Sequence, residues 1–307
     1  MESLTQFALR ENYEKVRKLR PNLEQMDKLI DWDEFLKLFP DRKTLRGRPA
    51  YDRIVMVKTL FLQNMYGISD EEIEFQINDR LSFRQFLGYP ETVPDYTTIW
   101  RFREWLTEEG LLDSVWAELS RQIEARGIRV QKGVVQDARF VEADPGKKRS
   151  GMEGRGREAK SSRSKDGTWT KKNGKAHFGF KMHTKVDRAT KLITGLAVTT
   201  AKTHDSAIDL AGPGDILYRD KGYTGAGSRA LGNGSMKRGN LSPAEWWRNK
   251  RIAKKRCIGE HPFATIQRSL NGGRTKLTTL GRVSVQQTFV AMAYNIYRLR
   301  FLVHGPS

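Results

Sequence analysis

In the first 125 residues, apolar positions recur every three or four residues, which predicts helices. One apolar stripe follows Pro49, a residue suited to a first helical turn, and stops at Gly67; its members are Ile54, Val57, Phe61 and Met65. Ser69 and Glu72 form the capping-box pattern of a second helix. After a break, Asp95 is placed to cap a further helix that has one apolar and one polar face.

Short helices, a tight break and a helix with a polar face are typical of a helix-turn-helix module. In that interpretation Arg101 and Arg103 of the last helix contact DNA, and Arg46 and Arg48 of the segment before Pro49 can enter an A·T-rich minor groove. A plain helical bundle, with a loop leading to a helix-starting proline, explains the same pattern equally well. The residues of this region leave both interpretations open.

The second half changes to a period of two, the pattern of half-buried strands. One predicted strand has Asp137 near its middle, residues 178–186 and 192–200 form an antiparallel hairpin, and residues 216–219 form a fourth strand that leads into Asp220. A short helix lies before the fourth strand, and a long amphipathic helix covers residues 285–299. We therefore predict a mixed α+β or α/β chain, with a helical region over residues 1–125 and a domain built on a mixed sheet over residues 130–303.

Residues 146–176 interrupt this second region. They contain 11 basic and 3 acidic residues, many Gly and Ser, and almost nothing apolar. Such a segment buries too little apolar surface to order itself, so we expect a flexible insertion. It is either a solvated spacer or a basic strap that becomes ordered on a phosphate backbone.

Composition narrows the class of protein. The 307 residues carry a net charge of +19, and their partition is uneven: residues 1–130 carry −3 and residues 131–307 carry +22. A folded chain so basic implies a polyanionic partner, either nucleic acid or an anionic membrane surface. No apolar run approaches the ~20 residues of a membrane span, no export signal is visible, and Cys257 alone allows neither an intrachain disulfide nor a cysteine zinc cluster. We expect a protein of the reducing cytoplasm.

Cutting and joining DNA requires an activated attacking oxygen and a stabilised leaving oxygen, which two Mg²⁺ ions held by carboxylates achieve together. Three carboxylates of the second half are candidates: Asp137 within an apolar strand, Asp220 at a strand end, and Glu260 near a helix start. An unpaired carboxylate in an apolar strand is costly, so Asp137 needs a partner or a metal. From the pattern alone, a salt bridge or a helix cap explains each of these residues better than a metal ligand does.

Four short motifs in one order and spacing resemble those of the insertion-sequence-five family of DDE transposases. The first half is also similar to the helical region of that family, so the resemblance covers roughly residues 30–303. The motifs are Gln136-Asp137-Ala138-Arg139 with Val141-Glu142-Ala143, Thr203-His204-Asp205-Ser206, Arg219-Asp220-Lys221-Gly222-Tyr223, and Arg256 ahead of Glu260.

The resemblance implies an RNase H-like fold and a DNA transposase. It implies that Asp137, Asp220 and Glu260 are catalytic and hold two Mg²⁺ ions, for which Mn²⁺ can substitute. Arg256 would hold a DNA phosphate near Glu260, and Lys221 and Tyr223 would contact the strand that enters the site. The enzyme would bind terminal inverted repeats, release 3′-hydroxyl ends by hydrolysis and join them to target DNA. We expect a homodimer on double-stranded DNA in the nucleoid of a prokaryotic cell, with no membrane partner.

Two positions depart from the family pattern. Ala253 stands where relatives usually have tyrosine, and Gln267 stands where they have lysine; the neighbouring Arg268 is a candidate replacement for that lysine. If Arg268 does not replace it, a phosphate contact is missing. The alternative function is therefore a catalytically inactive, transposase-derived protein that binds specific DNA sequences.

Overall fold

The computed structural model describes residues 22–40, 51–130, 133–146, 164–172 and 174–305, together with positions 11, 13–15 and 18. The chain divides into two compact units: residues 1–126 with 296–307, and residues 127–295. The boundary lies one residue after the predicted helical region. The end of the last helix, which we assigned to the second domain, groups with the first unit.

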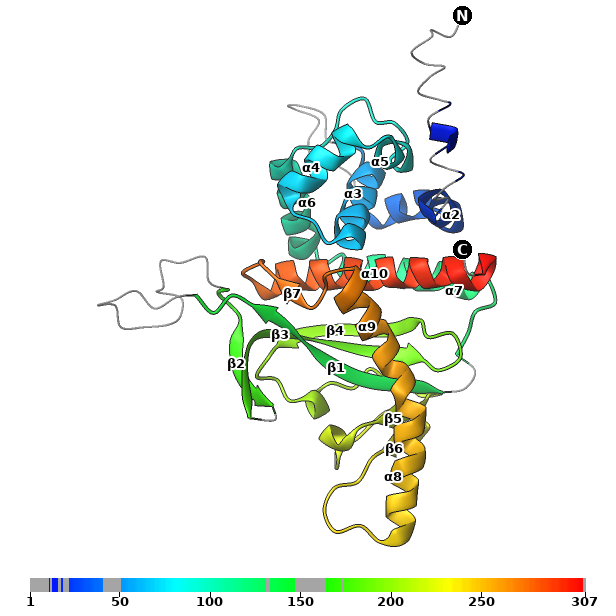
Figure 1. Cartoon of the computed structure of the whole chain (residues 1–307), viewed down its shortest axis with the longest axis vertical. Helices are drawn as coiled ribbons and strands as arrows, with labels where there is room; N and C mark the ends of the chain where they lie inside the picture. Colours follow the sequence, from blue (N-terminus) through cyan, green and yellow to red (C-terminus); the bar gives the residue numbers. More distant parts are fainter. Residues whose placement is uncertain are drawn as a thin grey trace, which may run out of the picture. The chain divides into compact units, whose positions relative to one another are not determined.

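The first unit is helical throughout, as predicted. Its elements are α2 (Asn22–Leu29), the 3-10 helix η1 (Asp33–Leu38), α3 (Arg53–Tyr66), α4 (Asp70–Asp79), α5 (Leu81–Phe86), α6 (Tyr96–Glu108) and α7 (Leu112–Ala125), shown in Figure 1. The final turns of α10 (Leu280–His304), from Ile296, complete this unit.

The helix ends follow the local chemistry that the sequence indicates. The side chain of Ser69 accepts a hydrogen bond from the backbone N–H of Glu72 at the start of α4, and Asp95 accepts one from Thr98 at the start of α6. Gly67 ends α3 in the left-handed conformation, with φ of 62°. The first turn of α3 differs from the prediction, because Asp52 and not Pro49 precedes it and caps it.

The second unit contains a seven-stranded mixed sheet (Figure 1). Its strands are β1 (Val134–Ala143), β2 (Thr168–Lys172), β3 (Lys175–Asp187), β4 (Ile193–Thr200), β5 (Ile216–Arg219), β6 (Gly232–Ser235) and β7 (Arg274–Thr275). The remaining elements are the 3-10 helices η2 (Asp205–Ala207), η3 (Lys221–Tyr223) and η4 (Cys257–Gly259), and the helices α8 (Pro243–Arg256), α9 (Glu260–Ser269) and α10.

The central strand β1 is paired differently on its two edges. On one edge it pairs antiparallel with β3 along nearly its whole length, from Val134 to Glu142. On the other edge it pairs with β5 at residues 134–135 and with β7 at residues 142–143, both in parallel. Among the described residues, no strand pairs with positions 136–141 on this second edge. The interval forms a gap in the sheet, and Asp137 lies at its start.

The predicted insertion differs from the structure at its C-terminal end. Residues 147–163 lie outside the described residues, but Thr168–Lys172 form β2, which pairs antiparallel with Lys175–Gly179 of β3. This hairpin extends the sheet on the edge of β3 that also carries β4. The segment that we expected to be flexible up to residue 176 therefore includes an ordered strand.

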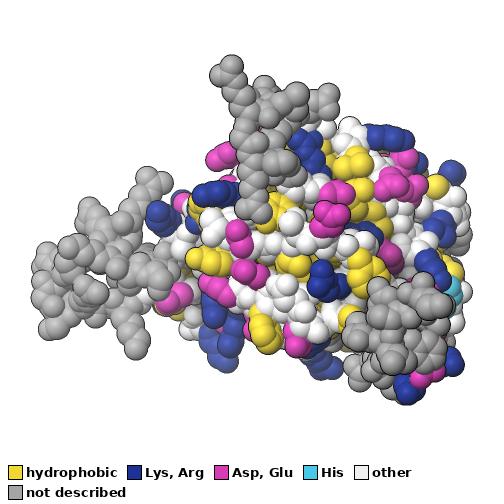
Figure 2. Space-filling model, turned by 90° about the horizontal axis from the view of Figure 1, so that it is seen from above, with side chains coloured by type: hydrophobic (Ala, Val, Ile, Leu, Met, Phe, Trp, Pro, Cys, Tyr) yellow, Lys and Arg dark blue, Asp and Glu magenta, His cyan; other side chains and the backbone are white. Residues whose placement is uncertain are grey.

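No helix among the described residues combines the length and the apolar content that crossing a bilayer requires. The face of the molecule seen in Figure 2 carries basic and acidic side chains interspersed with one another, without an area of a single sign. The excess positive charge is therefore not concentrated on this face.

Candidate active site

Asp137 lies on β1 at the start of the gap in the sheet. Its Oδ2 accepts a hydrogen bond from Nη2 of Arg256 at 2.9 Å, and its Oδ1 accepts one from the backbone N–H of Ala138 at 2.9 Å. Burial raises the pKa of this carboxyl group, the Arg256 charge opposes that rise, and the negative charge of Asp220 adds to it. A carboxylate with this environment favours a further positive charge beside it.

Asp220 follows β5, the parallel neighbour of β1, so both aspartates lie at the same side of the sheet. Its Oδ1 accepts a hydrogen bond from the backbone N–H of Gly222 at 2.7 Å, and this bond caps η3. A Cβ atom on Gly222 would lie 2.8 Å from the same oxygen. Glycine at this position therefore allows the turn that fixes the Asp220 carboxylate.

Glu260 is the first residue of α9, directly after η4. The preceding Gly259 is buried, and a Cβ atom there would come within 2.6 Å of Cγ1 of Val135 on β1. Only a residue without a side chain allows η4 to approach the sheet this closely. The close approach brings Glu260 to the strand that carries Asp137.

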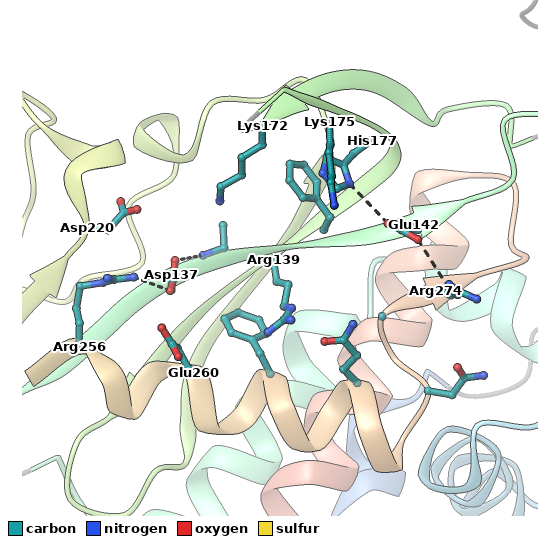
Figure 3. Close-up of a pocket in the computed structure, with 16 residues that line it drawn as sticks. Asp137, Arg139, Glu142, Lys172, Lys175, His177, Asp220, Arg256, Glu260 and Arg274 are labelled. Atoms are coloured by element: carbon teal, nitrogen blue, oxygen red, sulfur yellow. Dashed lines mark hydrogen bonds and ion pairs between the residues drawn. The ribbon is translucent and has the colours of Figure 1, made fainter. Parts of the chain in front are cut away.

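The three carboxylates and Arg256 lie at one end of a single cavity of about 990 Å³ (Figure 3). Their donor atoms are hard oxygens, which fit Mg²⁺ or Mn²⁺. Among the described residues, however, no three acidic, histidine or cysteine side chains converge on one ion. The residues present fit a divalent cation that shares its coordination between a few carboxylates and the substrate.

The rest of the cavity is mainly basic. Arg139 and Lys172 lie between the carboxylates and the far end, where Lys175 and Arg274 lie together with Glu142, whose Oε2 is 3.8 Å from Nε of Arg274 (Figure 3). The Phe140 and His177 rings stack there, with centroids 4.4 Å apart and planes inclined by 7°. We name this region, defined by these four cations, the basic end. The sequence analysis missed it, although Asn173-Gly174 between two runs of strand-like residues is a strong hairpin signal.

Two of the residues predicted to contact DNA are enclosed by the protein. Tyr223 is fully buried beside the Arg219 guanidinium, and burial raises the pKa of its hydroxyl above the usual range. Arg103 is 4% exposed and forms an ion pair with Asp70. The expectation of a direct DNA contact is wrong for both side chains, because each one is packed away from the surface.

The other residues predicted to contact DNA differ in where they lie and in whether the structure describes them. Arg101 and Lys221 are exposed on α6 and η3, and Arg46 and Arg48 lie outside the described residues. Gln267 lines the cavity, whereas the exposed Arg268 is not among the described residues that line it. Arg268 therefore does not take the place of the expected lysine in the cavity.

Two protein families and a known transposase match the chain. Residues 11–105 match the family described as transposase domain DUF772, and residues 129–296 match the family described as transposase DDE domain. The chain is 28% identical over 229 residues to the transposase for insertion sequence element IS1106 of Neisseria meningitidis serogroup B, a match that covers 67% of this chain and 79% of that protein. No solved structure matches the chain significantly.

The second family match spans more than half of the chain and contains all three carboxylates of the cavity. It implies an RNase H-like fold, which agrees with a mixed sheet flanked by helices, and domains of this kind generally use divalent metal ions. The chain belongs to the transposase DDE domain family.

Proposed function

We propose that this transposase binds the terminal inverted repeats of its insertion sequence, cleaves the element ends by hydrolysis and joins the resulting 3′-hydroxyl groups to target DNA. The observation that carries the proposal is the acidic end of the cavity. Three carboxylates from β1, from the turn after β5 and from the start of α9 line it together, beside the Arg256 guanidinium. Intact acids at all three positions do not favour the inactive DNA-binding alternative. The narrower assignment to the insertion-sequence-five family remains a prediction.

In this proposal Asp137, Asp220 and Glu260 hold two Mg²⁺ ions, or Mn²⁺ in their place. When bound, such ions activate an attacking oxygen and stabilise the leaving oxygen of an in-line displacement at phosphorus. The turn at Gly222 and the close contact at Gly259 hold the Asp220 and Glu260 carboxylates in place, so little reorganisation is needed when the substrate binds.

Arg256 has two partners in this scheme. Without metal it neutralises Asp137, and with DNA present it is placed to bind the phosphate that reacts. Water is the nucleophile of the first displacement, and the released 3′-hydroxyl is the nucleophile of the second. Because two element ends must be joined to one target, the active species would be a homodimer on DNA, in the nucleoid of a prokaryotic cell.

Strand cleavage on a labelled duplex with the repeats that flank the gene tests the proposal. We expect Mg²⁺-dependent release of a 3′-hydroxyl at the repeat boundary by the native chain, and no release by Asp137→Ala or Glu260→Ala. Retained duplex binding by both variants provides the control for folding. Tight binding without cleavage by the native chain, in Mg²⁺ and in Mn²⁺, would support the inactive alternative instead.

A further inference from the structure

We propose that the basic end of the cavity binds the backbone of one DNA strand as it leaves the reacting phosphate, with Lys172, Lys175 and Arg139 in contact with its phosphates. This inference rests on the proposed function, because it takes DNA as the substrate of the neighbouring carboxylates. It assigns a role to the β2–β3 hairpin, a part of the domain that contributes no catalytic group.

The two lysines face each other across the hairpin. Lys172 of β2 and Lys175 of β3 are directly paired in the register, and both line the cavity. Like charges placed directly opposite on a hairpin are destabilising. Both side chains are exposed, and neither forms an ion pair with a residue among those described. An anion between them would remove this repulsion.

Other cations of the same unit are neutralised by the protein. Lys181 pairs with Asp205 at 2.8 Å and Lys185 with Asp215 at 3.0 Å, and both lysines lie on β3 beyond the hairpin. Lys181 and Lys185 therefore stabilise the fold through ion pairs. Lys172 and Lys175 at the basic end have no such partner among the described residues, so their charges can bind a ligand.

The hairpin is supported by the strand that carries the first aspartate. Phe140 of β1 stacks on His177 of β3, and Nδ1 of His177 lies 3.6 Å from Oε1 of Glu142. The ammonium group of Lys172 lies 5.7 Å from the centre of the Phe140 ring. These contacts hold the cationic hairpin against β1 at a fixed distance from the carboxylates.

That distance suits a continuous strand. Phe140 follows Asp137 by three residues, which is roughly 10 Å along a β-strand. One strand of duplex DNA carries a phosphate about every 3.4 Å along the helix axis. Because successive phosphates are at least this far apart, the phosphates that contact the lysines should lie at most about three nucleotides from the one that reacts. A cavity that continues from the acids to the hairpin can follow the backbone over this interval (Figure 3).

A salt titration of DNA affinity tests the proposal without metal. The native chain is compared with two double variants in EDTA, and the measured quantity is affinity for the duplex used for cleavage. The first variant is Lys172→Gln with Lys175→Gln, and the matched control is Lys165→Gln with Lys171→Gln. Both double variants lose two positive charges from exposed lysines of the same segment, but Lys165 and Lys171 do not line the cavity. We expect the first variant to bind about tenfold more weakly and to lower the salt slope by about 1.8, since each phosphate contact contributes about 0.9. Equal effects of the two variants would overturn the proposal.

A scan with uncharged methylphosphonates locates the contact. In the native chain, neutral linkages about one to three nucleotides from the cleavage position should weaken binding. In the Lys172/Lys175 variant the same linkages should have no further effect. Additive losses would show that the lysines do not touch these phosphates. If the native chain binds but never cleaves, the proposed function fails while the salt-slope difference remains. If it cleaves and the two double variants behave alike, only this inference fails.

Discussion

Two arginine–aspartate ion pairs, one in each unit, have similar chemistry and different surroundings. Arg103 and Asp70 join α6 to α4, with side chains 4% and 20% exposed, and Gln63 accepts a further hydrogen bond from Arg103 at 3.1 Å. Arg256 and Asp137 are 17% and 19% exposed, and they line a cavity that also contains Asp220 and Glu260. In the first pair the charges balance, and both side chains hold helices together. Around the second pair three carboxylates face one arginine, and this excess of negative charge indicates a binding site for a cationic ligand.

The largest expected effect comes from the second pair. Asp137→Asn should lower Mg²⁺-dependent cleavage by about 10³-fold or more, because several kcal/mol of transition-state stabilisation depend on this carboxylate. The same change should raise the melting temperature in EDTA, since burial and Asp220 make the charged form unfavourable in the folded state. Calorimetry with and without Mg²⁺ checks this: metal should stabilise the native chain and leave the variant unchanged. A variant that is less stable than the native chain in EDTA would contradict the comparison.

The next largest effect is on stability, which should fall by different amounts when each arginine is removed. Arg103→Ala leaves Asp70, which is only 20% exposed, without its charged partner and should lower the free energy of unfolding by about 3–5 kcal/mol. Arg256→Ala leaves Asp137 similarly enclosed, but burial already raises the pKa of this carboxyl group. It can therefore take up a proton when the arginine is removed, and the loss should be smaller, about 1–3 kcal/mol. Urea denaturation of the two variants measures both values. Similar losses would mean that both pairs serve the fold alike.

Acid should affect the catalytic unit through His183. Burial lowers the pKa of this histidine from 6.5 to about 4, and its Nε2 lies 2.9 Å from Oγ1 of Thr199. Because the unfolded state then binds the proton more tightly, the stability that neutral His183 contributes is complete above pH 6.5. It is lost as the pH falls towards 4, by about 3 kcal/mol in total. Melting temperatures of the native chain and His183→Gln between pH 7 and pH 4 test this, and the variant should show the shallower dependence. Parallel curves would exclude His183 as the cause.

Gly259 tests how the third acid is positioned. Gly259→Ala places a methyl group against Val135 and should cost about 1–3 kcal/mol as η4 is pushed from β1. We expect cleavage to fall more than duplex binding does, because Glu260 moves with η4. Val135→Ala in the same chain makes space for the new methyl group, and it should restore part of the cleavage. Unchanged cleavage in Gly259→Ala would show that the close contact does not position Glu260.

The smallest effect is expected at Gln267. Gln267→Lys adds a positive charge to the cavity wall and should tighten DNA binding by less than about tenfold, with a salt slope steeper by about 0.9. Arg268→Gln, outside the cavity, is the matched control and should leave the cleavage rate nearly unchanged. A larger loss for Arg268→Gln than gain for Gln267→Lys would restore Arg268 as the substitute.

Local signals predicted the elements with clear caps or clear periodicity. Ser69, Asp95 and Gly67 end or begin helices where the sequence indicates, and the strands around Asp137 and before Asp220 are confirmed. The strand β6 was missed because its four residues, Gly-Asn-Gly-Ser, include nothing apolar, and β7 was missed because it has only two residues. The strand β2 was missed because its composition is that of the basic insertion, although its Lys and Thr residues lie on a hairpin.

The candidate site was predictable only in part, for a similar reason. A motif gives the position of a carboxylate in the chain, and the three acids do line one cavity. A motif does not tell whether the side chains beside that carboxylate are buried or exposed. Tyr223 and Arg103 belong to motifs that suggest DNA contact, yet their side chains fill space inside the protein. The basic end depends on register between β2 and β3, which is a property of pairing and not of either segment alone.

Helices α2 and α10, far apart in the sequence, meet in the helical unit, and this sets the order in which the unit can pack. Nη1 of Arg300, near the end of α10, donates hydrogen bonds to Oδ1 of Asn22 at 2.8 Å and to Oε1 of Gln25 at 3.0 Å on α2. Asn22 precedes Arg300 by 278 residues, so during synthesis α2 cannot complete its packing until the end of α10 has emerged. A fragment that stops at residue 126 lacks these partners. A helix translated before the sheet domain thus reaches its final state only after that domain has been made.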